Sequence, residues 1–292
     1  MDQIRLGYQL PEKGVDALIS VLKMLGVNPE EEVDPQELPF DWQYQMNVYL
    51  TLVDDQFMNL GEEPVRTFVT SFLTTTYEHY VDTDRTKAGN SACDIGALYY
   101  TGRLSDDGNP DYESAFEWYQ KGAELDNVQS LINLGYCYEY GRVGERNPDK
   151  AFKCYLLASC IGDLPEALYK FGDCFSRGNG VEKNKDAAFG LYFKAYRYIN
   201  QHEGGSEEIA PEVKGSVYKR LADCLFYDEM VMDDVTQYGY KFEIDRRMEI
   251  LRLYQDAERC FRVAIENGAT YYSKQLEKVI EQQDAIRNQF SE

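Results

Sequence analysis

The segment Leu134-Gly135-Tyr136-Cys137-Tyr138-Glu139-Tyr140-Gly141 decides the fold, because the chain repeats it with variations. Two other segments align with it without gaps: Ile95-Gly96-Ala97-Leu98-Tyr99-Tyr100-Thr101-Gly102 and Phe171-Gly172-Asp173-Cys174-Phe175-Ser176-Arg177-Gly178. The first glycines of the three segments stand 39 and 37 residues apart. Self-similarity at a period of this length is the signature of a repeat architecture. The chain is therefore predicted to be a series of structural repeats.

A second pattern follows each of these segments: a small residue, an aromatic residue and another small residue fall at positions i, i+4 and i+7. This spacing places all three on one face of a helix, where the small residues let a neighbouring helix approach and the aromatic ring fills the space between. Each repeat is therefore predicted to be a pair of helices. The three sets are Ala115, Tyr119 and Gly122, then Ala151, Tyr155 and Ala158, then Ala188, Tyr192 and Ala195.

Signals for the ends of these helices agree with the pattern. A glycine, which readily takes the positive φ of a helix C-cap, stands where each first helix should end. An Asp or Asn, whose side chain accepts hydrogen bonds from first-turn amides, stands four residues before the alanine of each second helix. The glycines are Gly102, Gly141 and Gly178, and the N-cap residues are Asp111, Asn147 and Asn184.

A fourth repeat is recognisable but longer. Leu221-Ala222-Asp223-Cys224-Leu225 resembles the first helix, with alanine in place of glycine. Ala257, Phe261 and Ala264 repeat the second-helix pattern. Ala222 and Ala257 are 35 positions apart, against 16 between the equivalent residues of the second and third repeats, so residues 228–245 are predicted to be an insertion. After Gly268, residues 271–292 are predicted to form a charged helix that covers the last exposed face.

At these positions the chain resembles the Sel-one-like repeats, a branch of the tetratricopeptide-like helical solenoids. Ala115-Phe116-Glu117-Trp118-Tyr119-Gln120-Lys121-Gly122-Ala123 matches the second helix of that family's pattern, Asp149-Lys150-Ala151 approximates its entry, and Gly178-Asn179-Gly180-Val181 matches its mid-repeat glycines. The resemblance implies an all-α fold, an α/α superhelix that is a right-handed solenoid of helix-turn-helix repeats. It also implies a concave surface, lined by the first helices, that holds protein partners in scaffolds or adaptors, and it implies no catalytic residues.

The expected domain organisation has three parts. Residues 1–90 do not show the repeat and are expected to be a helical N-terminal cap or subdomain, with helices at Gly14–Leu25, Phe40–Leu60 and Pro64–Val81. Residues 91–270 hold the repeats, at about 91–126, 127–163, 164–200 and, expanded, 210–268. Residues 271–292 form the C-terminal capping helix.

Composition excludes several classes of function. The chain has 292 residues, and 51 acidic against 30 basic residues give a formal net charge of -21, which repels phosphate backbones, so no nucleic-acid partner is expected. No signal-peptide pattern and no apolar run of membrane-spanning length is present, so no membrane association is expected. Seven cysteines show no Cys-x-x-Cys pair, and Leu168 stands where a disulfide-bridged repeat would pair Cys160. We therefore expect a soluble protein of the reducing cytoplasm.

No constellation of residues indicates an enzyme, and no cofactor or metal is expected. Most cysteines fall on repeat positions, where cysteine acts as a small buried hydrophobe. His79 and His202 lie in no spacing that suits a zinc pair or a nucleophile. The loop from Asp107 resembles a calcium loop but has Tyr112 where glycine is needed and Trp118 where glutamate should bind. Two alternatives stay open: an enzyme with an acidic or metal-dependent site in residues 1–90 or 228–245, and self-association.

The predicted partner surface follows from transferring the groove positions of tetratricopeptide repeats onto each first helix. The hypothesis is a groove for an extended or helical peptide that carries Lys or Arg plus an apolar anchor, with the negative field accelerating encounter. Tyrosine suits such a surface because it offers a large contact area with a polar tip. The alternative is that several of these tyrosines pack between repeats. The predicted partner-binding residues are Tyr100, Ile132, Tyr136, Glu139, Tyr140, Tyr169, Asp173, Arg177, Lys219, Asp223, Phe226 and Tyr227.

Overall fold

The computed structural model describes residues 10–27, 42–54, 62–105, 107–202, 209–227 and 245–289. Within these ranges every regular element is a helix, so the predicted all-α solenoid class is confirmed. The chain divides into two compact units, Met1–Arg146 (unit 1) and Asn147–Glu292 (unit 2). The division falls inside the predicted second repeat, between its two helices, so each unit is described by itself.

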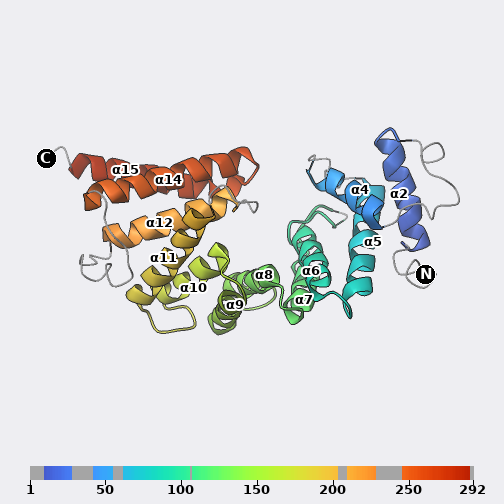
Figure 1. Ribbon diagram of the computed structural model, residues 1–292, viewed down its shortest axis with the longest axis horizontal. Helices are drawn as coiled ribbons and strands as arrows, with labels where there is room; N and C mark the ends of the chain where they lie inside the picture. The colour runs from blue at the N-terminus through green and yellow to red at the C-terminus, as the bar shows by residue number, and fades with distance from the viewer. Residues whose placement is uncertain are drawn as a thin grey trace. The chain divides into compact units, whose positions relative to one another are not determined.

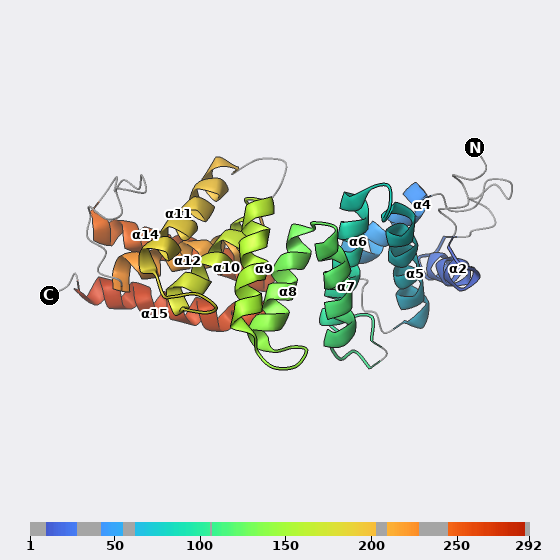
Figure 2. The same cartoon turned by 90° about the horizontal axis from the view of Figure 1, so that it is seen from below.

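Unit 1 contains helices at all three positions predicted for the N-terminal region. The ends of the predicted Phe40–Leu60 helix lie outside the described residues. The central helix α5 packs against α2, α4 and α6, and α7 packs against α6 and α8. Helices α5, α6 and α7 stand side by side in Figure 2. The bounds are α2 (Glu12–Met24), α4 (Trp42–Asp54), α5 (Glu63–Tyr80), α6 (Arg85–Tyr100), α7 (Tyr112–Glu124) and α8 (Val128–Tyr140).

Unit 2 contains the later repeats and the C-terminal helix. Helix α14 packs against both α12 and α15, which flank it in Figure 1. Val279 and Ile286 of α15 are buried in the core of this unit, as expected for a capping helix. The predicted insertion at 228–245 lies outside the described residues except for Asp245. The bounds are α9 (Pro148–Ile161), α10 (Pro165–Arg177), α11 (Lys185–Gln201), α12 (Pro211–Tyr227), α14 (Arg246–Glu266), η1 (Thr270–Tyr272) and α15 (Ser273–Gln289).

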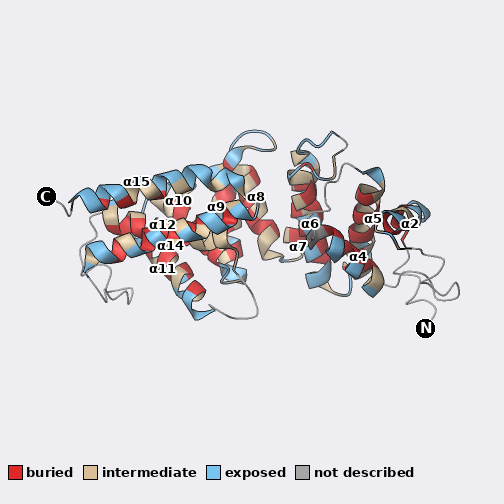
Figure 3. Cartoon of the chain, turned by 90° about the horizontal axis from the view of Figure 1, so that it is seen from above, coloured by how far each residue is buried: buried red, intermediate tan, exposed pale blue. Residues whose placement is uncertain are grey.

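The first helices of successive repeats stack on each other inside each unit. Helix α6 contacts α8 in unit 1, and α10 contacts α12 in unit 2, in addition to the contacts between chain neighbours. Contacts between every second helix are expected of stacked repeats that each contact only their neighbours. Figure 3 shows that the buried residues of each unit lie on the helix sides that face other helices.

The predicted starts and ends of the repeat helices are confirmed. Gly102, Gly141 and Gly178 have φ values of 76°, 63° and 74°, in the left-handed region that favours glycine. Each predicted N-cap carboxylate or amide oxygen accepts a hydrogen bond from a backbone N–H three residues on. These bonds run to Asp111 from Ser114 (3.0 Å), to Asn147 from Lys150 (3.0 Å) and to Asn184 from Ala187 (2.9 Å).

Within a repeat, the aromatic ring of the second helix packs flat against a glycine of the first. A Cβ atom on Gly172 would lie 2.6 Å from Cε1 of Tyr192, and one on Gly96 would lie 2.6 Å from Cδ1 of Tyr119. Both tyrosine side chains are buried. These two glycines are therefore required for the close approach of two helices rather than for an unusual backbone conformation.

The fourth repeat has a different register from the one predicted. Ala257, Phe261 and Ala264 are buried as expected, but Phe261 packs over Gly215, with 2.8 Å between its Cε1 atom and a Cβ placed on that glycine. The ring that faces the Ala222 segment belongs to Tyr254, whose hydroxyl donates to Asp223 at 2.8 Å. The prediction of the pairing was wrong by seven residues, because α12 and α14 are long enough to make two aromatic contacts in succession.

We predict that Gly172→Ala destabilises the fold by about 1–3 kcal/mol, because the added methyl group overlaps the enclosed Tyr192 ring. The measurement is urea unfolding followed by circular dichroism. Ser176→Ala on the same helix is the matched control and should change the free energy of unfolding by less than about 0.5 kcal/mol. Equal stability of the two variants would contradict the proposed contact.

Candidate functional site

The predicted partner-binding residues divide between the two units and differ in exposure. In unit 1, Tyr140 is exposed, Tyr100 and Tyr136 are half-buried, and Ile132 and Glu139 are buried. In unit 2, Arg177 and Tyr227 are exposed, Tyr169 and Asp173 are buried, and the half-buried residues are Lys219, Asp223 and Phe226. Only the exposed and half-buried members of the predicted set are therefore accessible to a partner.

In unit 1 an arginine gathers the predicted tyrosines into one cluster. The guanidinium of Arg142 donates from Nε to the hydroxyl of Tyr100 at 3.0 Å. Its central carbon lies 4.8 Å from the ring centroid of Tyr112 and 5.7 Å from that of Tyr140. The ring of Tyr136 stacks on Tyr140 with centroids 6.0 Å apart. These five residues are called the tyrosine-arginine cluster below.

Local backbone geometry explains how Arg142 reaches this place. Helix α8 ends at Gly141 in the left-handed conformation, and the backbone N–H of Arg142 donates to the carbonyl oxygen of Cys137 at 2.9 Å. This arrangement closes the helix and turns the chain back, so the next side chain lies over the helix end. Sequence reasoning missed Arg142 and Tyr112, although each directly follows a predicted cap residue, Gly141 or Asp111.

The hydroxyl of Tyr100 in this cluster is protonated. Burial raises the pKa of the Tyr100 hydroxyl above its ordinary value of 10.0, although Arg142 opposes the shift. The hydroxyl therefore stays protonated at neutral pH. Cation-π attraction to several rings and one hydrogen bond hold the arginine in place.

Ile132 and Glu139 are packed inside unit 1. The side chain of Ile132 is 0% exposed and belongs to the core. Glu139 is also buried, and its carbonyl oxygen accepts a hydrogen bond from Nε of Arg146 at 2.7 Å. The transfer of groove positions from tetratricopeptide repeats places these two residues on the correct helix, but neighbouring elements cover them.

In unit 2 Asp173 is the centre of a buried ionic network. Nε and Nη2 of Arg220 donate to its two carboxylate oxygens, each at 2.6 Å, and the hydroxyl of Tyr192 donates at 2.8 Å. Arg177 lies 3.5 Å away on the exposed side. The guanidinium of Arg220 also lies 4.4 Å above the ring centroid of Tyr169. The predicted groove residues Asp173 and Tyr169 therefore bind Arg220 inside the unit.

The network keeps Asp173 charged despite its burial. Burial by itself raises the pKa of this carboxyl, but the charge and hydrogen bonds of Arg220, with Arg177 and Lys170, outweigh it and lower the pKa from 3.8 to about 2. A bidentate pair with satisfied oxygens is the geometry that compensates for the loss of solvent around two buried charges. Arg220 comes from α12, so the pair joins the third repeat to the fourth.

Asp223 is the equivalent residue of the fourth repeat and is also occupied. Its oxygens accept from Nζ of Lys219 at 2.5 Å and from the hydroxyl of Tyr254 at 2.8 Å. The acidic side chains predicted to attract a basic partner are thus buried or paired within the chain. Any attraction to a basic partner must come from the summed field.

That field differs sharply between the units. The sequence of unit 1 carries 26 acidic and 10 basic residues, whereas that of unit 2 carries 25 and 20. Residues 147–202, which form α9 to α11, contain eight lysines and arginines against six acidic residues. The negative charge of the chain therefore belongs mainly to unit 1, and α9 to α11 have a small excess of positive charge.

Four of the seven cysteines are buried, and Cys160 is exposed. Cys137, Cys174 and Cys224 are buried, as predicted from their repeat positions. Burial raises the pKa of the Cys154 thiol to about 11, only partly opposed by Lys150, which keeps it protonated and unreactive at neutral pH. His202 stacks on Tyr198 with centroids 4.0 Å apart. Within the described ranges, no helix combines the length and apolarity that crossing a membrane requires.

The repeats identified from this geometry match a known family. A family model described as Sel1 repeat matches residues 90–127, 128–163 and 165–197. The chain therefore contains three segments that match the Sel1 repeat. The matched segments overlap the first three predicted repeats, and the expanded fourth repeat lies outside the match. No curated protein is similar to the chain in sequence.

A solved structure of a Sel1 repeat protein has a similar fold. The crystal structure of this protein, from Oxalobacter formigenes, superimposes with a TM-score of 0.51 and 16% identity, covering 95% of this chain and 98% of the other. A protective antigen of uropathogenic Escherichia coli strains with an SLR fold has a TM-score of 0.42 and 18% identity, covering 94% of this chain and 60% of the other. The first similarity supports the all-α fold described above.

We predict that acid removes the stabilisation supplied by Asp173. The folded-state pKa of about 2 lies below the ordinary 3.8, so the contribution is complete above about pH 4 and is lost as the pH falls toward 2. Its size should be on the order of 2 kcal/mol. Urea unfolding between pH 7 and pH 2.5 should show this loss in the wild type and not in Asp173→Asn. The same acid sensitivity in both proteins would contradict the assignment.

A double-mutant cycle tests the pairing with Arg220 independently of pH. Asp173→Asn and Arg220→Met should each destabilise the protein by roughly 3–5 kcal/mol, because each leaves a buried charge without its partner. The double variant should cost clearly less than the sum of the two single variants. Additive costs would show that the two side chains do not stabilise each other.

Proposed function

We propose that this Sel1-repeat protein is an adaptor or regulator that binds another protein through the tyrosine-arginine cluster of unit 1. Sel1-repeat proteins generally mediate protein-protein interaction. The observation that carries the proposal is Tyr140, which is 49% exposed yet stacked on Tyr136 and held from the side by Arg142. Exposed aromatic rings in a fixed orientation are characteristic of interface anchors.

Preorganisation supports this surface over the other predicted positions. The rings of Tyr136 and Tyr140 already contact each other, so a partner orders few additional side-chain torsions on binding. Arg142 ties them to Tyr100 of the preceding repeat through the 3.0 Å hydrogen bond. Binding therefore uses a surface formed by two repeats, which a single helix pair does not provide.

The other predicted residues take different parts in the proposal. Arg177, Lys219, Asp223, Phe226 and Tyr227 are retained as a candidate extension of the binding surface on unit 2. The remaining four act through packing and are removed from the list of direct contacts because they are buried. These are Ile132, Glu139, Tyr169 and Asp173.

The proposed partner segment carries Lys or Arg next to an apolar residue. Unit 1 has an excess of 16 acidic over basic residues, which draws a cationic segment toward it. The ring of Tyr140, which is 49% exposed, offers apolar area to the residue next to the cation. The predicted groove acid of this unit, Glu139, is buried, so we expect the attraction to act mainly on encounter.

We also propose that the protein acts in the cytoplasm. No disulfide joins any of the seven cysteines, all of which lie in the described ranges, and this supports a reducing compartment. Among the alternatives from the sequence, self-association of two copies through the same cluster would use the same rings and is an outcome of the first test below. No described residue favours a catalytic role.

We predict that Tyr136→Ala/Tyr140→Ala loses the partner while remaining folded. Affinity capture from the native cell extract, followed by titration of the captured protein, should show at least a tenfold weaker affinity than for the wild type, or about 1.4 kcal/mol. Tyr271→Ala is the matched control, because Tyr271 is a 73% exposed tyrosine in unit 2. Unchanged capture by the double variant refutes the proposed surface, and concentration-dependent mass without a captured protein indicates self-association.

We further predict that salt acts mainly on the association rate. Raising the salt from 50 to 300 mM should slow association of the captured partner severalfold and change its dissociation rate by less than about twofold. The reason is that the field of unit 1 attracts the partner, whereas the aromatic contacts hold it. A salt-independent association rate would remove the cationic segment from the proposal.

A further inference from the structure

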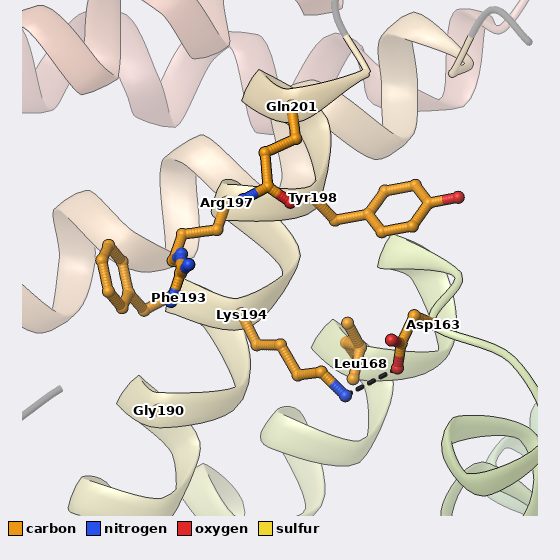
Figure 4. Close-up of a pocket in the computed structure, with 8 residues that line it drawn as sticks. All are labelled: Asp163, Leu168, Gly190, Phe193, Lys194, Arg197, Tyr198 and Gln201. Carbon is orange, nitrogen blue, oxygen red and sulfur yellow. Dashed lines mark hydrogen bonds and ion pairs between the residues drawn. The ribbon is translucent and has the colours of Figure 1, made fainter. Parts of the chain in front are cut away.

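Unit 2 contains a pocket that none of the predicted partner-binding residues lines. It has a volume of about 350 Å³ and lies between α10 and α11, next to the connection that follows α9 (Figure 4). Ligand sites range over about 300–1,000 Å³, so this pocket is at the small end and suits a short group rather than an extended cofactor. Gly190, Lys194, Arg197 and Gln201 line it along one face of α11.

The polar side of the pocket is basic. Nζ of Lys194 forms an ion pair with Oδ1 of Asp163 at 2.6 Å, and both side chains are about half exposed. Arg197 stands one turn further along α11, is exposed, and forms no ion pair with any residue that the structure describes. Lys194 extends toward Asp163, whereas Arg197 extends to the other side, toward Phe193 (Figure 4). Two cations and one carboxylate therefore line the pocket, which leaves a net positive charge there.

The floor of the pocket is apolar. Leu168 of α10 and Phe193 of α11 line it and are buried, so they offer carbon surface but do not project into solvent. The pocket thus combines a planar guanidinium, an ammonium group and an amide with a hydrophobic base. A guanidinium fork matches a carboxylate in two parallel hydrogen bonds, a geometry that an ammonium group does not offer.

The wider charge distribution makes this pocket different from the rest of the chain. The segment that builds it, residues 147–202, has more basic than acidic residues, although the whole chain has a net charge of -21. An anionic group that the protein as a whole repels is therefore favoured locally. At physiological salt, charges more than about 8 Å apart are largely screened from each other. The cations that line the pocket therefore determine whether an anion binds there.

We propose that this pocket binds an acidic side chain of a protein partner, with an adjacent apolar side chain against Phe193. Arg197 receives the carboxylate in a bidentate contact, and Lys194, which stays paired with Asp163, adds positive charge to the pocket. A carboxylate next to an apolar side chain is favoured over a free phosphate group, because the pocket lining offers apolar surface beside the guanidinium. The site goes beyond the proposed function, because its preference for acidic segments is opposite to that of the tyrosine-arginine cluster.

Fluorescence anisotropy with synthetic peptides tests this site in the full chain at 150 mM salt. The first probe is a labelled peptide of alternating glutamate and leucine with both ends blocked, so its only carboxylates are side chains. The second probe has glutamine in place of glutamate. The third probe contains glutamine and leucine with a free C-terminus, and it tests whether the site binds a terminal carboxylate. In a fourth arm, inorganic phosphate competes with the first probe, which tests whether the site binds phosphate.

The expected result is saturable binding of the glutamate probe and at least tenfold weaker binding of the other two peptides. Arg197→Gln should weaken binding of the glutamate probe at least tenfold. Lys153→Gln is the matched control, because it removes the same charge from the same segment at an exposed position of α9 outside the pocket, and it should change binding less than twofold. Asp163→Asn should strengthen binding, because it removes the one acidic side chain of the pocket lining.

Several outcomes overturn the proposal. Equal binding of the glutamate and glutamine probes would leave only an apolar surface. Equal weakening by Arg197→Gln and Lys153→Gln would assign the binding to the general field of α9 to α11. Tighter binding of the free C-terminus probe, or competition by phosphate at equal concentration, would assign the site to a different anion. Tyr136→Ala/Tyr140→Ala leaves the pocket intact, so its loss of a partner does not bear on this test.

Discussion

The contact between an aromatic ring of one helix and a glycine of its partner sets the packing of the helix pairs α6–α7, α10–α11 and α12–α14. Tyr119 on Gly96, Tyr192 on Gly172 and Phe261 on Gly215 all have the ring closer than van der Waals contact to the place where a Cβ atom would stand. A glycine there lets the two backbones approach, and the ring fills the remaining space to the density of a protein interior. The spacing of the two helices in each pair follows from this contact.

The same contact positions polar groups that connect one repeat to the next. When the ring of Tyr192 lies on Gly172, its hydroxyl reaches the carboxylate of the following residue, Asp173. That carboxylate is then turned toward Arg220 on the first helix of the fourth repeat. Tyr254 and Asp223 repeat the arrangement one repeat later. In a solenoid, stability depends on such interfaces between neighbours as well as on the repeats themselves.

This use of acidic residues changes the expected character of the binding surface. The acids of the predicted groove, Glu139, Asp173 and Asp223, are buried or paired, so they stabilise the structure and do not form a row of exposed carboxylates. The remaining features are an aromatic cluster in a strongly acidic unit and a basic pocket beside α11, and the two binding proposals are based on these features.

The helical secondary structure, the helix pairing of the first and third repeats and the capped helix ends follow from the sequence. Periodicity identified the repeats, because a helix that buries one face has small and aromatic residues at positions i, i+4 and i+7. The caps could be predicted because they depend on only one or two residues. The buried faces of Ala115, Ala151 and Ala188 were predicted for this reason. The fourth repeat was placed two turns out of register, because similar small and aromatic residues recur along α14 and only packing selects between them.

The exposure of each predicted groove residue depends on the tertiary structure. Helical offsets assign a side chain to a face, but exposure depends on what other elements place against that face, as Ile132 shows. The pairing of Asp173 with Arg220 joins residues 47 positions apart, and Arg142 reaches three tyrosines from two other helices and its own. Such contacts depend on side-chain rotamers and on the distances between helices. Neither can be predicted from a local sequence pattern. The pocket beside α11 arises in the same way, from side chains that come together only when the helices pack.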